Sequence, residues 1–105
     1  MPETITKTDA EVTAEMFKAA AERRGVPEHL IGGLVRYLAY RIPPGGFLTA
    51  FLSNDLFGAM NKADDESRAG FFQIATFLYC EAPAASHGSP ERVAAWLRGN
   101  TKAAA

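Results

Sequence analysis

The sequence has little of several features that would point to a particular chemistry. It contains one cysteine, Cys80, which excludes an intramolecular disulfide and a zinc site of several cysteines, and which is typical of a reducing cytosol. Its two histidines, His29 and His87, have no cysteine, histidine or carboxylate at metal-ligand spacing in the chain. We therefore expect no metal site and no cofactor.

Net charge and long apolar runs are also missing. Eleven Lys and Arg residues against twelve Asp and Glu residues give a formal charge of -1. The chain thus lacks the basic excess that nucleic acid or an anionic membrane demands. No stretch approaches the roughly 20 apolar residues of a membrane span, and residues 1–7 have no apolar leader segment. We expect a cytoplasmic protein that binds neither nucleic acid nor membranes.

Groups for nucleophilic catalysis are equally scarce. Ser86 and His87 are adjacent, and neighbouring residues rarely orient a base on a nucleophile, while no third group is visible. Cys80 lies near the end of an apolar helical pattern, which predicts a buried, inert thiol. The sequence therefore predicts that the chain is not an enzyme.

What the sequence does contain is helical periodicity. Of its 105 residues, 48% are hydrophobic, and no segment has the alternating pattern of a strand. Glycine and proline divide this pattern into about five stretches. We expect an all-α fold, a compact bundle forming one domain over residues 1–105 with frayed tails at 1–7 and 100–105. The expected helices span about 8–25, 27–42, 47–63, 65–82 and 89–99.

Two neighbouring helices in this scheme, 47–63 and 65–82, are apolar on nearly every side. Either the other three helices cover them or a partner does, and the second possibility predicts a homo-oligomer through these central helices. The aromatic anchors of a protein-binding surface would be Phe51, Phe57, Tyr79 and Trp96. Trp96 is either a core anchor of the last helix or a further interface residue. Gly32 and Gly33, inside an apolar helical pattern, predict a close packing contact.

Asp55 falls in an apolar arc of the expected helix 47–63, so its carboxylate needs a donor. One interpretation is structural: a pair with Arg36 or Arg41, or a cap on the amides of residues 44–47. The other is an acid that faces a ligand, extended by the neighbouring Ser53 and Asn54.

A turn after the second helix is the second candidate site. Gly45 and Gly46 precede a helix and leave amides that suit a phosphate or carboxylate. The residues just before the turn could add charge and a stacking face for a planar ligand: Arg36, Tyr37, Tyr40 and Arg41. The competing interpretation of Pro43-Pro44-Gly45-Gly46 is a tight turn between helices, because the strand and lysine of a P-loop are missing.

Several spaced blocks in the second half of the chain carry a resemblance. They are Pro43-Pro44-Gly45-Gly46-Phe47-Leu48-Thr49-Ala50, Leu52-Ser53-Asn54-Asp55-Leu56, Ala63-Asp64-Asp65-Glu66, Glu81-Ala82-Pro83 and Gly88-Ser89-Pro90-Glu91-Arg92-Val93-Ala94-Ala95-Trp96-Leu97. In this order they resemble a family of small uncharacterised proteins encoded by phages and prophages. The likeness covers residues 33–98, while the first helix looks like an addition and loop 84–87 lacks the tryptophan of the family pattern.

The resemblance implies a phage accessory protein, and such proteins often block a host component or sequester a small signalling molecule. The first hypothesis is therefore a non-enzymatic protein-binding module that self-associates, binds a host or phage protein and blocks a host defence component. The alternative is a binder that sequesters a small anionic, nucleotide-like ligand at residues 36–46, with Asn54 and Asp55 nearby.

Overall fold

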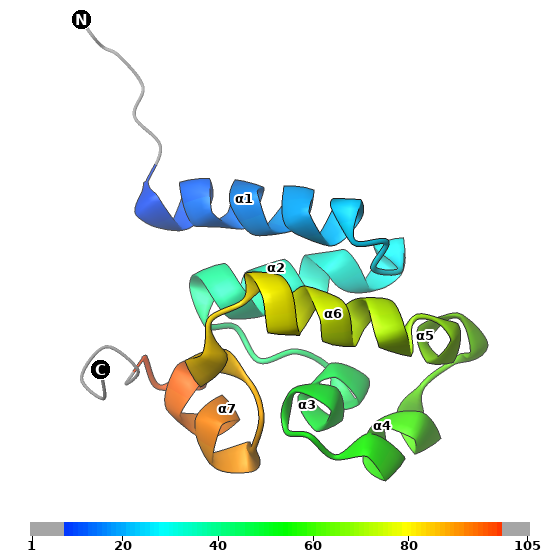
Figure 1. The fold of residues 1–105 in the computed structure, drawn as a ribbon. Coiled ribbons are helices and arrows are strands. Elements are labelled where there is room, and N and C mark those ends of the chain that lie inside the picture. The colour runs from blue at the N-terminus through cyan, green and yellow to red at the C-terminus, as the bar shows by residue number, and fades with distance from the viewer. Residues whose placement is uncertain (1–7, 100–105) are drawn as a thin grey trace, which may run out of the picture.

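Residues 8–99, the part of the chain that the structure describes, form seven α-helices and a short 3₁₀ helix with no strand (Figure 1). The computed structural model thus confirms the all-α fold class, although with seven helices rather than about five. The predicted tails at 1–7 and 100–105 lie outside the described residues. The elements are α1 (Asp9–Arg23), α2 (Glu28–Tyr40), α3 (Gly46–Leu52), α4 (Leu56–Lys62), α5 (Asp65–Ala69), α6 (Phe71–Glu81), η1 (Ala84–Ser86) and α7 (Pro90–Leu97).

The two additional helices arise because both predicted central helices are interrupted. Asn54 takes a left-handed backbone conformation with φ 66°, and the Asp55 carboxylate then caps a new helix by accepting from the Gly58 amide at 3.0 Å. This break separates α3 from α4. Gly70 separates α5 from α6, and a Cβ on that glycine would overlap the ring of Pro27. Only glycine therefore lets the α1–α2 connection pack at this position.

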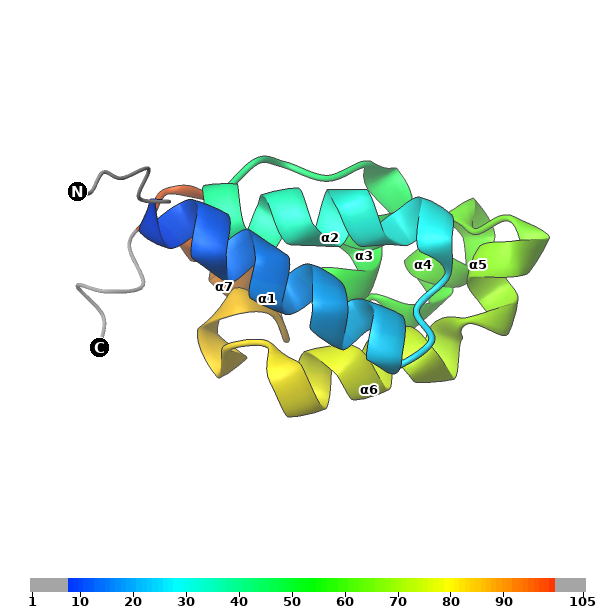
Figure 2. The same ribbon diagram turned by 90° about the horizontal axis from the view of Figure 1, so that it is seen from above.

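The helices are arranged in three layers. α1 and α2 form an antiparallel hairpin, and α1 lies across both α2 and α6 (Figures 1 and 2). Beneath α2 and α6 lie α3, α4 and α7, which form the third layer in Figure 1. None of the helices in residues 8–99 combines the length and the apolar character needed to cross a membrane.

The core lies between these layers and draws on all of them. Its buried apolar side chains include Phe17, Leu30, Ile31, Leu34, Tyr37, Leu38, Leu48, Leu52, Ile74, Phe77, Leu78, Val93 and Trp96. A Cβ on Gly33 would lie 3.1 Å from Leu48 Cδ1, so α2 and α3 approach closely there. This confirms the predicted close packing at Gly33, whereas a Cβ on Gly32 would meet the Arg36 side chain of its own helix.

An aromatic lock joins α2, η1 and α7 in this core. The Tyr37 hydroxyl donates to the Ser86 carbonyl at 2.7 Å, and Trp96 Nε1 donates to the Tyr37 carbonyl at 3.0 Å. The Arg41 guanidinium stacks on the Trp96 ring at 3.6 Å and donates to the Trp96 carbonyl at 2.8 Å. Burial raises the pKa of Tyr37 to about 12, so its hydroxyl keeps the proton that makes the first of these bonds.

Candidate functional site

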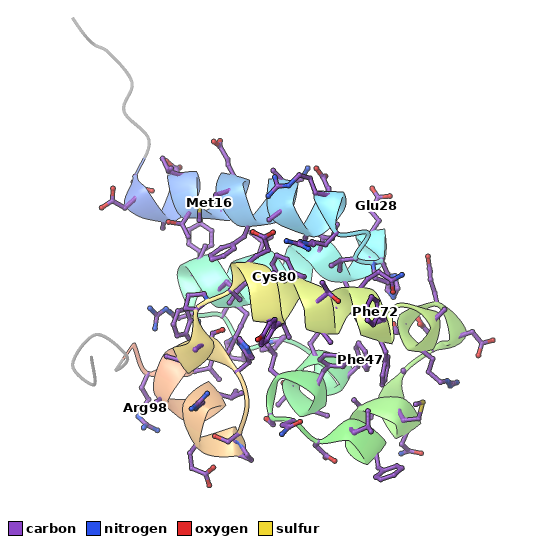
Figure 3. The ribbon with its side chains drawn as sticks, in the orientation of Figure 1. Met16, Glu28, Phe47, Phe72, Cys80 and Arg98 are labelled. Atoms are coloured by element: carbon purple, nitrogen blue, oxygen red, sulfur yellow. The ribbon has the colours of Figure 1, made fainter. Side chains whose placement is uncertain are left out.

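Helix α6 is apolar on two opposite faces, and only one of them is covered. Ile74, Phe77 and Leu78 face inward and are buried, whereas Phe72 is 77% exposed and Tyr79 is 88% exposed. Figure 3 shows Phe72 near the start of the helix, and Figure 2 places α6 at one edge of the described part of the protein. The surrounding helices thus cover the inner face alone. We call the outer row Phe72, Ala75, Thr76 and Tyr79 the α6 stripe.

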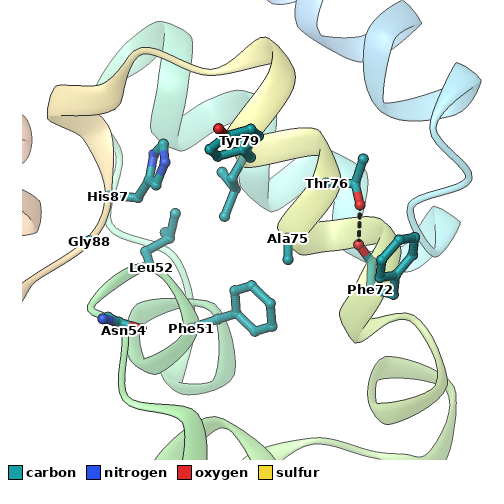
Figure 4. A pocket seen from close by; sticks show the side chains of 10 residues that line it. Phe51, Leu52, Asn54, Phe72, Ala75, Thr76, Tyr79, His87 and Gly88 are labelled. Atoms are coloured by element: carbon teal, nitrogen blue, oxygen red, sulfur yellow. Dashed lines mark hydrogen bonds between the residues drawn. The ribbon is translucent and has the colours of Figure 1, made fainter.

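A groove of about 470 Å³ runs beside the α6 stripe (Figure 4). Its walls are α6, the end of α3 and the segment that follows η1. The side chains and backbone that line it are Phe51, Leu52, Asn54, Phe72, Ala75, Thr76, Leu78, Tyr79, His87 and Gly88. This lining contains no carboxylate, amine or guanidinium group, so the groove is largely apolar.

Hydrogen bonds fix two polar groups of the groove, the Thr76 hydroxyl and the His87 imidazole. The Thr76 hydroxyl donates to the Phe72 carbonyl at 2.7 Å within α6 (Figure 4). The Ser86 hydroxyl donates to the Pro83 carbonyl at 2.7 Å, so its oxygen must accept from His87 Nδ1, which lies 2.9 Å away. Burial, and then the nearby Arg92 guanidinium, lowers the pKa of His87. The imidazole is therefore neutral at neutral pH, and the groove carries no charge.

The four predicted interface residues fall into three different environments. Phe51 and Tyr79 come together as opposite parts of the groove. Phe57 is 82% exposed on α4 and is not among the groove residues. Trp96 is only 5% exposed, in the aromatic lock, which is the core alternative of its two interpretations.

The predicted burial of Asp55 is wrong. Its side chain is exposed and caps α4, because the helix on which it was placed ends at Leu52, three residues earlier. Its carboxylate accepts a hydrogen bond from the Gly58 amide and not from the expected partners, which were Arg36, Arg41 or the amides of residues 44–47. Asn54, next to it, is exposed and lines the groove.

The residues predicted to hold an anion do not converge on one place. Tyr37 and Arg41 belong to the aromatic lock. Arg36 lies over Gly32 and faces a shallow depression between α1 and α2. Gly46 lies instead beside Lys62, in a separate depression that also includes Asp55, while Tyr40 and Gly45 are exposed. The fold therefore directs these side chains into different surroundings.

Sequence spacing missed a cluster around His29, because its members come from α2 and α5. His29 Nε2 lies 3.0 Å from Ser67 Oγ, and His29 Nδ1 lies 3.5 Å from a Glu66 carboxylate oxygen. These distances resemble those of a nucleophile and its base. Ser67, however, is only 3% exposed, and its amide and hydroxyl bond to Asp64, lowering the pKa of that carboxyl. We interpret the cluster as a structural link between α2 and α5.

Two further observations bear on chemistry. Cys80, expected to be buried, is exposed, because it lies on the outer side of α6. Among residues 8–99, no three His, Cys, Asp or Glu side chains are grouped so that they could hold a metal ion.

Comparisons with protein-family models, curated proteins and solved structures find no match to this chain.

Proposed function

We propose that this chain is a non-enzymatic protein-binding module, and that the α6 stripe and its groove form the binding surface. The observation that carries the proposal is the exposure of Phe72 and Tyr79 beside an uncharged groove. Large exposed aromatic side chains that flank a groove are typical of interaction sites, since aromatic residues dominate interface energies.

The form of the groove favours a protein over a small solute. It is bounded by helix surfaces and lined mainly by apolar side chains. Helical apolar segments commonly bind in such grooves, with side chains at positions i, i+3, i+4 and i+7 as anchors. The α6 stripe itself has this spacing, so it matches the surface of another helix.

The biological setting is part of the same proposal. The ordered blocks of residues 33–98 resemble proteins of phages and prophages, which supports an accessory protein that binds a host or phage protein in the cytoplasm. Blocking a host defence component is the specific role that we propose in this setting. Sequestration of a small anionic ligand stays a prediction. Thermal denaturation with a panel of nucleotides tests it, because a bound ligand stabilises the folded protein and raises its melting temperature.

The experiment compares the wild-type protein with a double variant, Phe72→Ala with Tyr79→Ala, as baits in a host-cell lysate. A matched control, Val12→Ala with Met16→Ala, removes two apolar side chains that are about half exposed on α1. We expect a host protein that the wild type and the control retain and that the α6 variant loses. Equal retention by all three baits, or no retention by any, would contradict the proposal.

A further inference from the structure

The α6 stripe has the same order of large and small side chains in both directions along the helix. Large aromatic residues, Phe72 and Tyr79, stand at its ends, and two small residues, Ala75 and Thr76, stand between them. The spacing i, i+3, i+4, i+7 is symmetric about the midpoint of residues 75 and 76. Such a stripe complements a copy of itself that runs in the opposite direction.

We propose that a second copy of this chain occupies the groove, through antiparallel pairing of two α6 helices about a two-fold axis at residues 75 and 76. This inference rests on the proposed function, because it takes the same surface as a protein-binding site. Phe72 of each copy then packs beside Tyr79 of the other, over the end of the groove that contains His87. The interface is closed, so it produces a dimer and not a filament.

The small residues at the centre allow the two helices to approach. Helices in contact lie about 8–10 Å apart, and the shorter distances need small side chains at the crossing point. Ala75 and Thr76 meet this need, and the Thr76 hydroxyl is already bonded to the Phe72 carbonyl of its own helix. No polar group of the central pair is therefore left without a partner when water is excluded.

The distribution of charge on this surface is compatible with a second copy. In a two-fold interface, a charged residue lies near its own like-charged copy only when it is close to the axis, so unpaired charge is unfavourable there. The stripe and groove lining hold no charged side chain. Near the end of α6, Glu81 is paired with Arg24 at 2.9 Å and with Arg23 at 3.9 Å.

The area available predicts a weak dimer. Each Phe or Tyr side chain offers about 150–250 Å², so the four exposed rings of two copies account for roughly 600–1,000 Å². A stable interface buries about 1,200–2,000 Å², and the groove walls around Phe51, Asn54 and His87 would supply the remainder. We therefore expect association in the micromolar range, with dimer at high concentration and monomer at low concentration.

Sedimentation equilibrium of the full chain between about 10 µM and 1 mM tests the pairing. We expect a monomer–dimer equilibrium that Ala75→Glu abolishes, because it places two carboxylates together at the axis. Ala75 is exposed on a helix, and far-UV circular dichroism verifies that the variant folds. The control is Ala94→Glu, at an alanine that is also exposed, on α7, and it should leave the equilibrium unchanged. A wild type that stays monomeric at 1 mM, or a dimer that Ala75→Glu leaves intact, overturns the inference.

Cysteine cross-linking tests the direction of the pairing. In the antiparallel arrangement the two native Cys80 residues are separated by about 13 Å along the helix axis, at 1.5 Å per residue, and cannot form a disulfide. A cysteine at position 75, made as Ala75→Cys with Cys80→Ser, lies next to its copy. We expect an oxidant to cross-link the position-75 variant far faster than the wild type. Faster cross-linking through Cys80 would indicate parallel helices and overturn the arrangement.

These measurements separate the dimer from the proposed function. A monomeric wild type that still loses a host protein on mutation of Phe72 and Tyr79 overturns the dimer and leaves the function standing. A dimer whose α6 variant retains the same host proteins as the wild type supports the dimer and contradicts the function.

Discussion

Trp96 and Tyr79 are both large aromatic side chains on apolar helices, yet their surroundings are opposite. Trp96 donates a hydrogen bond, stacks with a guanidinium and is almost completely buried. Tyr79 projects from α6 beside the groove. Apolar side chains in this small protein therefore have two separate roles, because the core buries only one face of α6. Side chains of the first kind stabilise the fold, and those of the second kind are available for binding.

The largest effect on stability is expected at the aromatic lock. Trp96→Ala removes a buried indole and its hydrogen bond to the Tyr37 carbonyl, so the free energy of unfolding should fall by about 3–5 kcal/mol. Urea denaturation followed by circular dichroism measures it. A loss below about 1 kcal/mol would mean that the lock does not stabilise the core.

Tyr37→Phe tests one bond of the same lock. The substitution keeps the ring but leaves the buried Ser86 carbonyl without its donor, and we expect a loss of about 1–3 kcal/mol. Tyr40→Phe, on the exposed end of the same helix, is the matched control and should change stability by less than about 0.5 kcal/mol. If both variants lowered the free energy of unfolding equally, the buried Tyr37 hydroxyl would stabilise the fold no more than the exposed Tyr40 hydroxyl, and the prediction would be wrong.

His87 lies between the aromatic lock and the α6 stripe, and we expect it to make the free energy of unfolding depend on pH. The folded protein binds a proton at this imidazole less readily than the unfolded chain, whose ordinary pKa is 6.5. As the pH falls through 6.5, the unfolded state gains the proton first, so the free energy of unfolding decreases, by at most about 1.4 kcal/mol per pH unit. His87→Gln should remove this part of the slope. An unchanged slope in the variant would contradict the prediction.

The smallest effect on stability is expected at the α6 stripe. Phe72→Ala and Tyr79→Ala remove side chains that are mostly in water, so each should alter the free energy of unfolding by less than about 0.5 kcal/mol. Urea denaturation at low protein concentration makes the measurement on the monomer. A decrease in the free energy of unfolding as large as that of Trp96→Ala would show that these rings stabilise the fold, and it would contradict the distinction between the α6 stripe and the core.

Local sequence signals predicted most helix ends but not the two internal breaks. The Thr8–Glu11 capping box and the Ser89-Pro90 start both occur in the structure. Ser53 and Asn54 gave a local hint of the first break, whereas the break at Gly70 depends on contact with Pro27, 43 residues away in the chain. The misplacement of Asp55 follows from the first break, since a helical wheel assigns faces only while the helix continues.

The candidate site was predictable in part for the same reason. The apolar character of their helices predicts Phe51 and Tyr79 as interface residues, and both line the groove. The opposite wall, with His87 and Gly88, could not be placed from local patterns. Its position depends on the Tyr37–Ser86 hydrogen bond, which joins residues 49 positions apart.

The bond from the Gly88 amide to the Leu52 carbonyl, at 2.8 Å, has a consequence for variation in this protein. It occupies a carbonyl that α3 leaves open at its C-terminus, and it joins two walls of the groove through backbone atoms alone. Most side-chain replacements in this loop therefore preserve the width of the opening, with Gly88 excepted because its φ is 117°. Insertion or deletion of a residue between Pro83 and Gly88 must instead shift one wall, so loop length governs which occupants fit.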